Sequence, residues 1–163
     1  LANGLGNLAS RVLAMLESYF DGEVPKATVQ GAEADLPVLV ADAMGRYDRL
    51  MLEVALTPAL GAVWEVVTRA NQYLVEKEPW QLAKDEGRRD ELASVLYAAA
   101  ETLRILAVLL SPIMPGAAAR LWKQLGITEP LSAQRLPGDA GWGGLAAGTR
   151  AAKGDALFPR LDS

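Results

Sequence analysis

The sequence predicts an all-α protein: a five-helix bundle followed by an irregular C-terminal extension. Apolar residues make up 51% of the 163 residues, with Ala and Leu dominant, which is typical of a helical globular protein. Over most of residues 1–126, apolar side chains recur every three or four positions, the period of an amphipathic helix. Beyond residue 126 this period is lost and glycines recur. We therefore expect a bundle at 1–126 and an extension at 127–163 that packs back on the bundle or on another domain.

The first helix is predicted over residues 1–20, because its apolar residues fall on one face. Asn7 and Arg11 lie four residues apart on a different, polar stripe, so both side chains project from the same side of the helix. Gly22 ends this helix, since glycine tolerates the left-handed conformation at a helix C-terminus. A loop follows over residues 23–31.

Two proline-marked starts predict the second and third helices. Asp35 can cap the second helix, with Pro37 in its first turn, where the missing N–H costs nothing. That helix runs to about residue 52. Thr57 and Pro58 repeat the pattern for a third helix, which runs to about residue 76.

Pro79 and Trp80 mark a junction after the third helix, because proline disfavours a helical residue just before it. A Trp at such a joint fits two interpretations equally well: a core residue under the joint, or a platform on which a flat partner such as a nucleobase stacks. Lys84, Arg88 and Arg89 follow. They fit an ordinary solvated helix start, although positive charge there opposes the helix dipole and hints at an external anion.

The fourth helix is predicted over residues 91–110, with Asp90 as its cap. It is apolar almost all round, so we expect it at the centre of the bundle. Pro115 opens a short fifth helix that Gly126 closes. The extension ends in an apolar peptide at 156–161 that would need a groove or a sheet edge.

Composition excludes several classes of function. The chain has no Cys and no His, which rules out disulfides, thiolate metal sites and a histidine base. Paired carboxylates stand mostly at helix starts, where the helix dipole explains them, so a carboxylate-based enzyme has no candidate site. The net charge of −4 argues against a nonspecific polyanion binder but allows a local nucleic-acid contact. With no membrane-spanning run and no signal peptide visible, we expect a cytoplasmic protein or part of one. We expect no cofactor or metal in this chain.

Asn7 and Arg11 form the most informative polar pair. The Asn amide and the Arg fork of N–H donors together can read the edge of an unpaired base, notably cytosine. A solvated helix face, with Arg11 paired to a carboxylate, is the alternative that the helix alone favours.

Short motifs over essentially the whole chain extend this pattern. They are Asn7-Leu8-Ala9-Ser10-Arg11, Asn71-x-Tyr73, Pro79-Trp80-x-x-Ala83-Lys84, the segment from Leu109 to Pro115, and Trp142 followed by Leu157-Phe158-Pro159-Arg160. In this order and spacing they resemble the C-terminal anticodon-binding domain of bacterial methionyl-tRNA synthetases. These class I enzymes attach methionine to its tRNA with ATP.

The resemblance implies a class I anticodon-binding bundle that contacts the CAU anticodon of methionine tRNA. Asn7 and Arg11 would hydrogen-bond to the first anticodon base, a cytosine, and Trp80 would stack on an unstacked base. Lys84, Arg88 and Arg89 would then lie near the phosphates of the anticodon stem.

The resemblance also implies a catalytic domain of the same enzyme as a second partner, in a monomer, with the peptide around Phe158 packing towards it. ATP, Mg²⁺ and any Zn²⁺ would belong to that domain. The family's HIGH-type and KMSKS-type motifs and its metal-bearing insertion do not occur here, so this chain alone is not expected to activate methionine. The alternative is a freestanding helical protein-interaction module that keeps the scaffold without RNA binding. Its motivation is the acidic net charge, and against it stands the presence of Asn7, Arg11 and Trp80.

Overall fold

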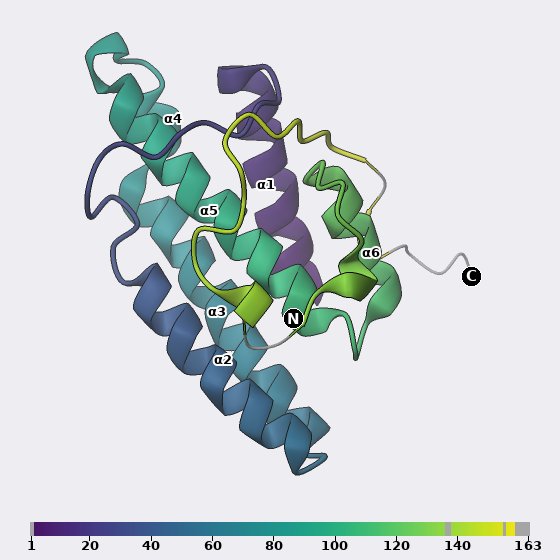
Figure 1. Cartoon of the computed structure of the whole chain (residues 1–163). Helices are drawn as coiled ribbons and strands as arrows, with labels where there is room; N and C mark the ends of the chain where they lie inside the picture. Colours follow the sequence, from purple (N-terminus) through teal and green to yellow (C-terminus); the bar gives the residue numbers. More distant parts are fainter. Residues whose placement is uncertain (1, 136–137, 155, 159–163) are drawn as a thin grey trace.

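The computed structural model describes residues 2–135, 138–154 and 156–158, and the regular elements of this part of the chain are helices (Figure 1). The helices are α1 (Ala2–Phe20), α2 (Leu36–Leu52), α3 (Leu56–Lys77), the one-turn α4 (Pro79–Leu82), α5 (Arg89–Leu110) and α6 (Pro115–Gln124), with 3₁₀ turns η1 (Glu86–Arg88), η2 (Leu131–Ala133) and η3 (Gly138–Ala140). Between the described residues there is no strand, only an isolated bridge between Glu23 and Arg150. The predicted five-helix bundle with an irregular extension is confirmed.

Helix α5 is the centre of the bundle. It packs against α1, α2, α3, α4 and α6, and from Leu92 to Leu110 every residue except Tyr97 is buried. By length and composition alone, the segment Glu86–Leu110 could cross a membrane, but 94% of its apolar window is buried inside the bundle. Packing on all sides therefore accounts for its apolar character, as the sequence predicted.

Helices α2 and α3 form an antiparallel hairpin (Figure 1) whose joint has an unusual residue. Ala55 N–H donates to Leu50 O at 2.8 Å and Val54 N–H donates to Met51 O at 3.0 Å, the two bonds of a Schellman motif. That motif needs one residue in the left-handed conformation, normally glycine. Here Val54 occupies this position, with φ 56°. A β-branched residue with positive φ is strained.

The start of α2 differs from the predicted cap in chemistry rather than position. Asp35 precedes α2, but its side chain makes no capping bond. It instead accepts a hydrogen bond from Arg69 Nε of α3 at 2.9 Å. This hydrogen bond to the guanidinium lowers the pKa of Asp35 from its ordinary value. Asp35 is therefore at the predicted N-cap position, but the predicted capping bond is wrong, because an ion pair to a neighbouring helix engages the carboxylate.

The other two predicted caps are also wrong. Ala55 is the N-cap of α3, since the chain enters α3 directly from the Schellman turn, and Thr57 lies in the first turn. Arg88 is the N-cap of α5, with Asp90 in the first turn. A capping bond does form one turn earlier, where Asp85 accepts from Gly87 N–H at 3.0 Å.

The C-terminal extension runs back along the bundle beside the loop after α1. Val24 N–H donates to Thr149 O and Ala151 N–H donates to Gly22 O, both at 2.8 Å. Close packing requires glycine at Gly126, which has φ 78° and where a Cβ would lie 1.8 Å from the carbonyl oxygen of Arg150. Four extension side chains join the main hydrophobic cluster: Ala140, Leu145, Ala151 and Leu157.

A buried ion pair on α5 holds the first part of the extension. The guanidinium of Arg104 contacts Glu101 at 2.6 Å and donates to the carbonyl oxygens of Asp139 and Gly141, both at 2.7 Å. Glu101 Oε2 in turn accepts from Leu145 N–H at 2.7 Å. Because Glu101 is 0% exposed and Arg104 is 4% exposed, this pair is a structural joint between the core and the extension.

Candidate nucleic-acid interface

The structure brings Trp80 and Arg11 together. Glu78 adopts the left-handed conformation, φ 48° and ψ 59°, between α3 and α4, which turns the chain so that Pro79 opens α4. The ring of Trp80 is half-buried, and the guanidinium carbon of Arg11 lies 5.7 Å from its centroid. This separation is within the range of a cation–π contact. Trp80 is thus not enclosed in the core, and its ring lies beside a cation.

Asn7 is exposed on α1 one helical turn before Arg11. The position of α1 is set by Asn71 of α3, whose side-chain Nδ2 donates to Gly4 O at 3.2 Å and to Val67 O at 3.1 Å. Tyr73, two residues further, is fully buried and donates its hydroxyl to Ala32 O at 2.7 Å. Asn71 therefore ties α3 to the start of α1, which carries Asn7 and Arg11, and Tyr73 ties α3 to the loop before α2.

Two hollows flank the ridge of α1 that carries Asn7 and Arg11. The first, of about 480 Å³, lies between α1 and α3, and Arg11, Gln72 and Val75 are among its lining residues. The second, of about 300 Å³, lies between α1 and the extension. Asn7 lines the second hollow together with Lys153, a residue from near the other end of the chain.

The three residues of the predicted basic run differ in their surroundings. Arg88 forms an ion pair with Glu91 at 2.9 Å. Arg89 donates to Tyr19 O at 2.8 Å and stacks over the ring of Phe20 at 4.4 Å, which satisfies a carbonyl near the C-terminus of α1. Lys84 is exposed and has no hydrogen-bond or ion-pair partner for its side chain in the part of the chain that the structure describes.

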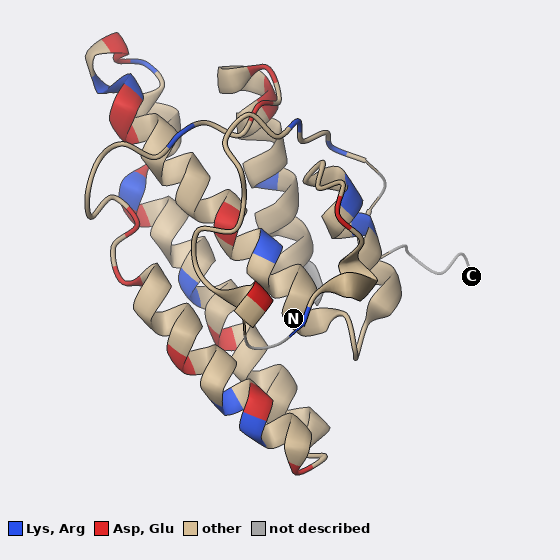
Figure 2. Ribbon diagram, in the orientation of Figure 1, with Lys and Arg blue, Asp and Glu red and all other residues tan. Residues whose placement is uncertain are grey.

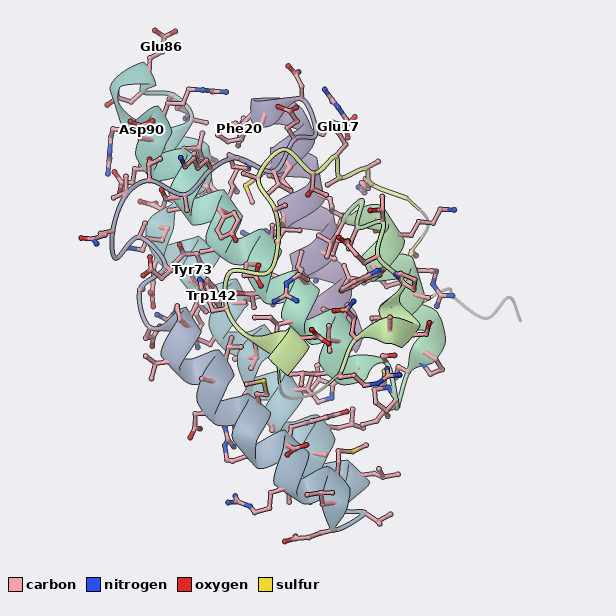
Figure 3. The ribbon with its side chains drawn as sticks, viewed as in Figure 1. Glu17, Phe20, Tyr73, Glu86, Asp90 and Trp142 are labelled. Atoms are coloured by element: carbon pink, nitrogen blue, oxygen red, sulfur yellow. The ribbon has the colours of Figure 1, made fainter. Side chains whose placement is uncertain are left out.

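Acidic side chains surround this basic run. Figure 3 shows Glu86 and Asp90 projecting at the same end of the molecule as Phe20. In Figure 2, Lys and Arg positions are interspersed with Asp and Glu rather than gathered in one patch. Any contact with a nucleic acid would therefore depend on individual side chains, not on a broad positive field.

Nothing in the described residues resembles a metal site, since no three Asp or Glu side chains come together there. The arrangement instead offers an aromatic ring beside a planar fork of N–H donors, with a side-chain amide one helical turn along α1 from that fork. These are the groups that proteins use to read bases of single-stranded RNA.

A family model described as the anticodon-binding domain of methionyl-tRNA ligase matches residues 24–163. This chain belongs to that family. The methionine–tRNA ligase of Caldanaerobacter subterraneus is 42% identical over 163 residues, which cover 99% of this chain and 25% of that protein. The enzyme of Streptomyces coelicolor is 44% identical over 169 residues, covering 99% of this chain and 31% of that protein.

Solved structures agree with this assignment. The free form of Mycobacterium tuberculosis methionyl-tRNA synthetase matches with a TM-score of 0.82 and 30% identity, covering 100% of this chain and 33% of that one. Its complex with methionyl-adenylate matches with a TM-score of 0.81 and 31% identity, over 98% of this chain and 31% of that one. The anticodon-binding domain thus spans about a quarter to a third of the length of the relatives it matches.

The sequence did not indicate Lys153 or the lining of the two hollows in this anticodon-binding domain. Lys153 lies in a glycine-rich stretch with no period, and only the folded path of the extension brings it beside Asn7. Gln72 and Val75 fall on the outer face of α3. Single polar and apolar side chains are common on any protein surface, so these two residues did not mark a binding surface in the sequence.

Proposed function

We propose that this domain recognises the CAU anticodon of methionine tRNA as part of a methionyl-tRNA ligase, which attaches methionine to tRNA with ATP. The observation that carries the proposal is the contact between Arg11 and a half-buried Trp80, with Asn7 one helical turn away. A stacking ring and two base-reading side chains on one surface match the way in which single-stranded RNA loops are read.

Cytosine fits the polar groups of this surface. Its O2 and N3 atoms accept hydrogen bonds, which the guanidinium of Arg11 can donate, and its N4 amino group donates to an acceptor such as Asn7 Oδ1. Guanine offers N–H donors where cytosine has acceptors. The N–H donors of Arg11 would then face other donors and make no hydrogen bond. Unpaired polar groups of this kind cost about 1–3 kcal/mol each, which favours the correct base.

We further propose that Lys84, Arg88 and Arg89 face the phosphates of the anticodon stem. Lys84 is the strongest of the three, because Arg88 and Arg89 already have partners within the chain. Phosphate contacts position an RNA without reading its sequence. Loss of Lys84 would therefore weaken binding to all anticodons alike.

In this proposal the rest of the reaction belongs to a catalytic domain in the same cytoplasmic, monomeric enzyme. The relatives are three to four times longer than this chain. ATP and Mg²⁺ would bind in that domain, and this domain would hold neither. Its part in the reaction would be to select the tRNA.

The proposal is tested by titrating the chain with two anticodon stem-loops that differ only in the anticodon, CAU or GAU. The expected result is tighter binding of CAU, and a loss of about 1–3 kcal/mol of binding free energy in Trp80→Ala, because the stacking contact is removed. Equal affinity for the two loops, or unchanged affinity in Trp80→Ala, would contradict the proposal.

A second candidate function, a helical protein-interaction module, is favoured by one observation. Leu52 is 80% exposed and Val54 is 76% exposed at the tip of the α2–α3 hairpin, and exposed apolar clusters mark interaction surfaces. This module would bind neither stem-loop, and its affinity for a protein partner would fall in Leu52→Asp but not in Arg11→Ala. Specific binding of the CAU loop would exclude it as the main function.

A further inference from the structure

We propose that Lys153 forms a phosphate-binding position beside the base-reading residues, where it contacts the sugar–phosphate backbone of the same RNA loop. The inference rests on the proposed function, because it assumes that a single-stranded loop lies across Asn7, Arg11 and Trp80. It adds a residue from the C-terminal extension to a surface otherwise built from α1 and α4.

The first argument is the chemistry of the hollow that Lys153 shares with Asn7. Its volume is about 300 Å³, and Ser10 and Lys153 add a hydroxyl and an ammonium group to the Asn7 amide. None of its described lining residues is Asp or Glu. The ammonium group of Lys153 has no ion-pair partner in the described part of the chain. The polar side of this hollow has N–H and O–H donors, one cation and no described carboxylate, and it faces the apolar Leu157 and Phe158. Such donors favour an anionic, strongly accepting group, of which phosphate is the RNA example.

The second argument is that the backbone around Lys153 is fixed. Ala152 N–H donates to Gln124 O at 2.7 Å, and Ala151 N–H donates to Gly22 O at 2.8 Å. On the other side, a Cβ at Gly154 would lie 3.2 Å from Nε2 of Gln124, so the chain passes α6 in close contact. A lysine on a fixed backbone loses less conformational freedom on binding than a lysine on a mobile segment.

The third argument is position relative to the bases. Asn7 lines the hollow that contains Lys153, and Arg11, one turn further along α1, meets Trp80. A strand whose base stacks on Trp80 and whose neighbouring backbone crosses α1 at Asn7 would place a phosphate at this hollow. Because lysine acts on phosphate as a point charge and not as a base reader, Lys153 would add affinity without discrimination.

The test measures how the affinity for the CAU stem-loop depends on salt in the wild-type chain and in Lys153→Gln. One phosphate contact to a single strand contributes a slope of about 0.7 in log K against log salt. Loss of that contact should reduce the slope by this amount, so the difference in affinity between the two proteins shrinks about 2.5-fold from 50 to 200 mM salt. Lys153→Arg should keep the slope, and the ratio of CAU to GAU affinity should not change in either variant.

Lys26→Gln is the matched control, because Lys26 is exposed in the loop after α1 and does not line the hollow. Its slope should equal that of the wild type. An unchanged slope in Lys153→Gln, with normal binding of CAU by the wild-type chain, would overturn the inference and leave the proposed function standing. Loss of the preference for CAU in Lys153→Gln would also overturn it, since a phosphate contact reads no sequence. Failure of the wild-type chain to bind the CAU loop would overturn both.

Discussion

The exposure of Trp80 follows from the geometry of a single helical turn. Pro79 and Leu82 of α4 are buried, and residues three apart share a face of a helix. Trp80 therefore projects from the side of α4 rather than into the core, and its ring stays half-buried against Arg11. The sequence alone left the core and platform interpretations equal, because this choice depends on which face of a four-residue helix meets α5.

Two buried tyrosines and one half-buried tyrosine predict a decline in stability at alkaline pH. Burial raises the pKa of Tyr47 and of Tyr97 to about 12, and it also raises the pKa of Tyr73. In the unfolded chain these groups titrate at their ordinary pKa of 10.0. The folded protein keeps its protons where the unfolded chain loses them, so the stabilisation is complete below pH 10 and is lost as the pH rises towards 12.

Tyr47→Phe tests this pH dependence. Tyr47 is 1% exposed and donates its hydroxyl to Leu109 O, so the variant should lose about 1 kcal/mol at pH 7. Between pH 10 and 12 its stability should fall less steeply than that of the wild type, because one titrating group is gone. Urea midpoints measured from pH 7 to 12 check both effects, and identical pH dependence in the two proteins would contradict the assignment.

At the scale of elements, the sequence predicted where the helices are but not how they begin. The predicted ends of α2, α3 and α5 agree with the structure to within a residue or so, because apolar periodicity reports the buried face directly. The caps at Thr57 and Asp90 were wrong in position, and Asp35 is at the N-cap of α2 but makes no capping bond. A capping side chain can be engaged by another helix, as Arg69 engages Asp35, and no local pattern reveals that partner.

The joint of the α2–α3 hairpin predicts a stabilising substitution. Val54→Gly should raise the free energy of unfolding by about 0.5–1 kcal/mol, since glycine relieves a left-handed strain of about 1–2 kcal/mol but gains freedom in the unfolded chain. The side chain of Val54 is 76% exposed, so little packing is lost. Chemical denaturation measures the change.

Glu53→Gly is the matched control for this prediction. Glu53 directly precedes Val54 and has φ −83°, a conformation that needs no glycine. This substitution should destabilise the chain through the added freedom of the unfolded state. Equal effects of the two glycines would show that strain at Val54 is not the cause.

At the scale of the whole molecule, the extension belongs to the folded core. Leu145 and Leu157 join the same hydrophobic cluster as the helices, and Glu101 with Arg104 ties residues 139–145 to α5. The division of the chain after residue 126 into two domains stays a prediction. Glu101 and Arg104 lie three residues apart in a mostly apolar helix, and this pattern in the sequence indicates a buried polar contact. The partners of the pair in the extension could not be predicted from the sequence.

Arg104→Met should therefore cost about 3–5 kcal/mol, because it leaves the Glu101 carboxylate buried without its partner. Amide exchange at Leu145 should rise more than exchange in the middle of α5, since the Leu145 N–H donates to Glu101. Arg46→Met is the control: its ion pairs with Asp42 and Glu65 lie at the surface and should contribute under about 1 kcal/mol. Similar losses in both variants would contradict a structural role for the buried pair.

The sequence predicted the five long helices and the residues of the proposed contact, but not the one-turn helix α4 or all of the surroundings of these residues. The spacing of Asn7 and Arg11 on one helix is local, and so the sequence could show it. The contact of Arg11 with Trp80 is tertiary and depends on α1 and α4 packing against the same helix, α5. The position of Lys153 beside Asn7 depends on the path of the extension and had no signal in the sequence.

The central claim is that Arg11 reads the first base of the anticodon, and a double-mutant cycle tests it most directly. Affinities are measured for the CAU and GAU stem-loops with the wild-type chain and with Arg11→Ala, and Arg49→Ala on the exposed surface of α2 serves as the control. The wild-type and control chains should prefer CAU. Arg11→Ala should lose about 1–3 kcal/mol of that preference, because the donors that distinguish cytosine are gone. An undiminished preference for CAU in Arg11→Ala would contradict the claim.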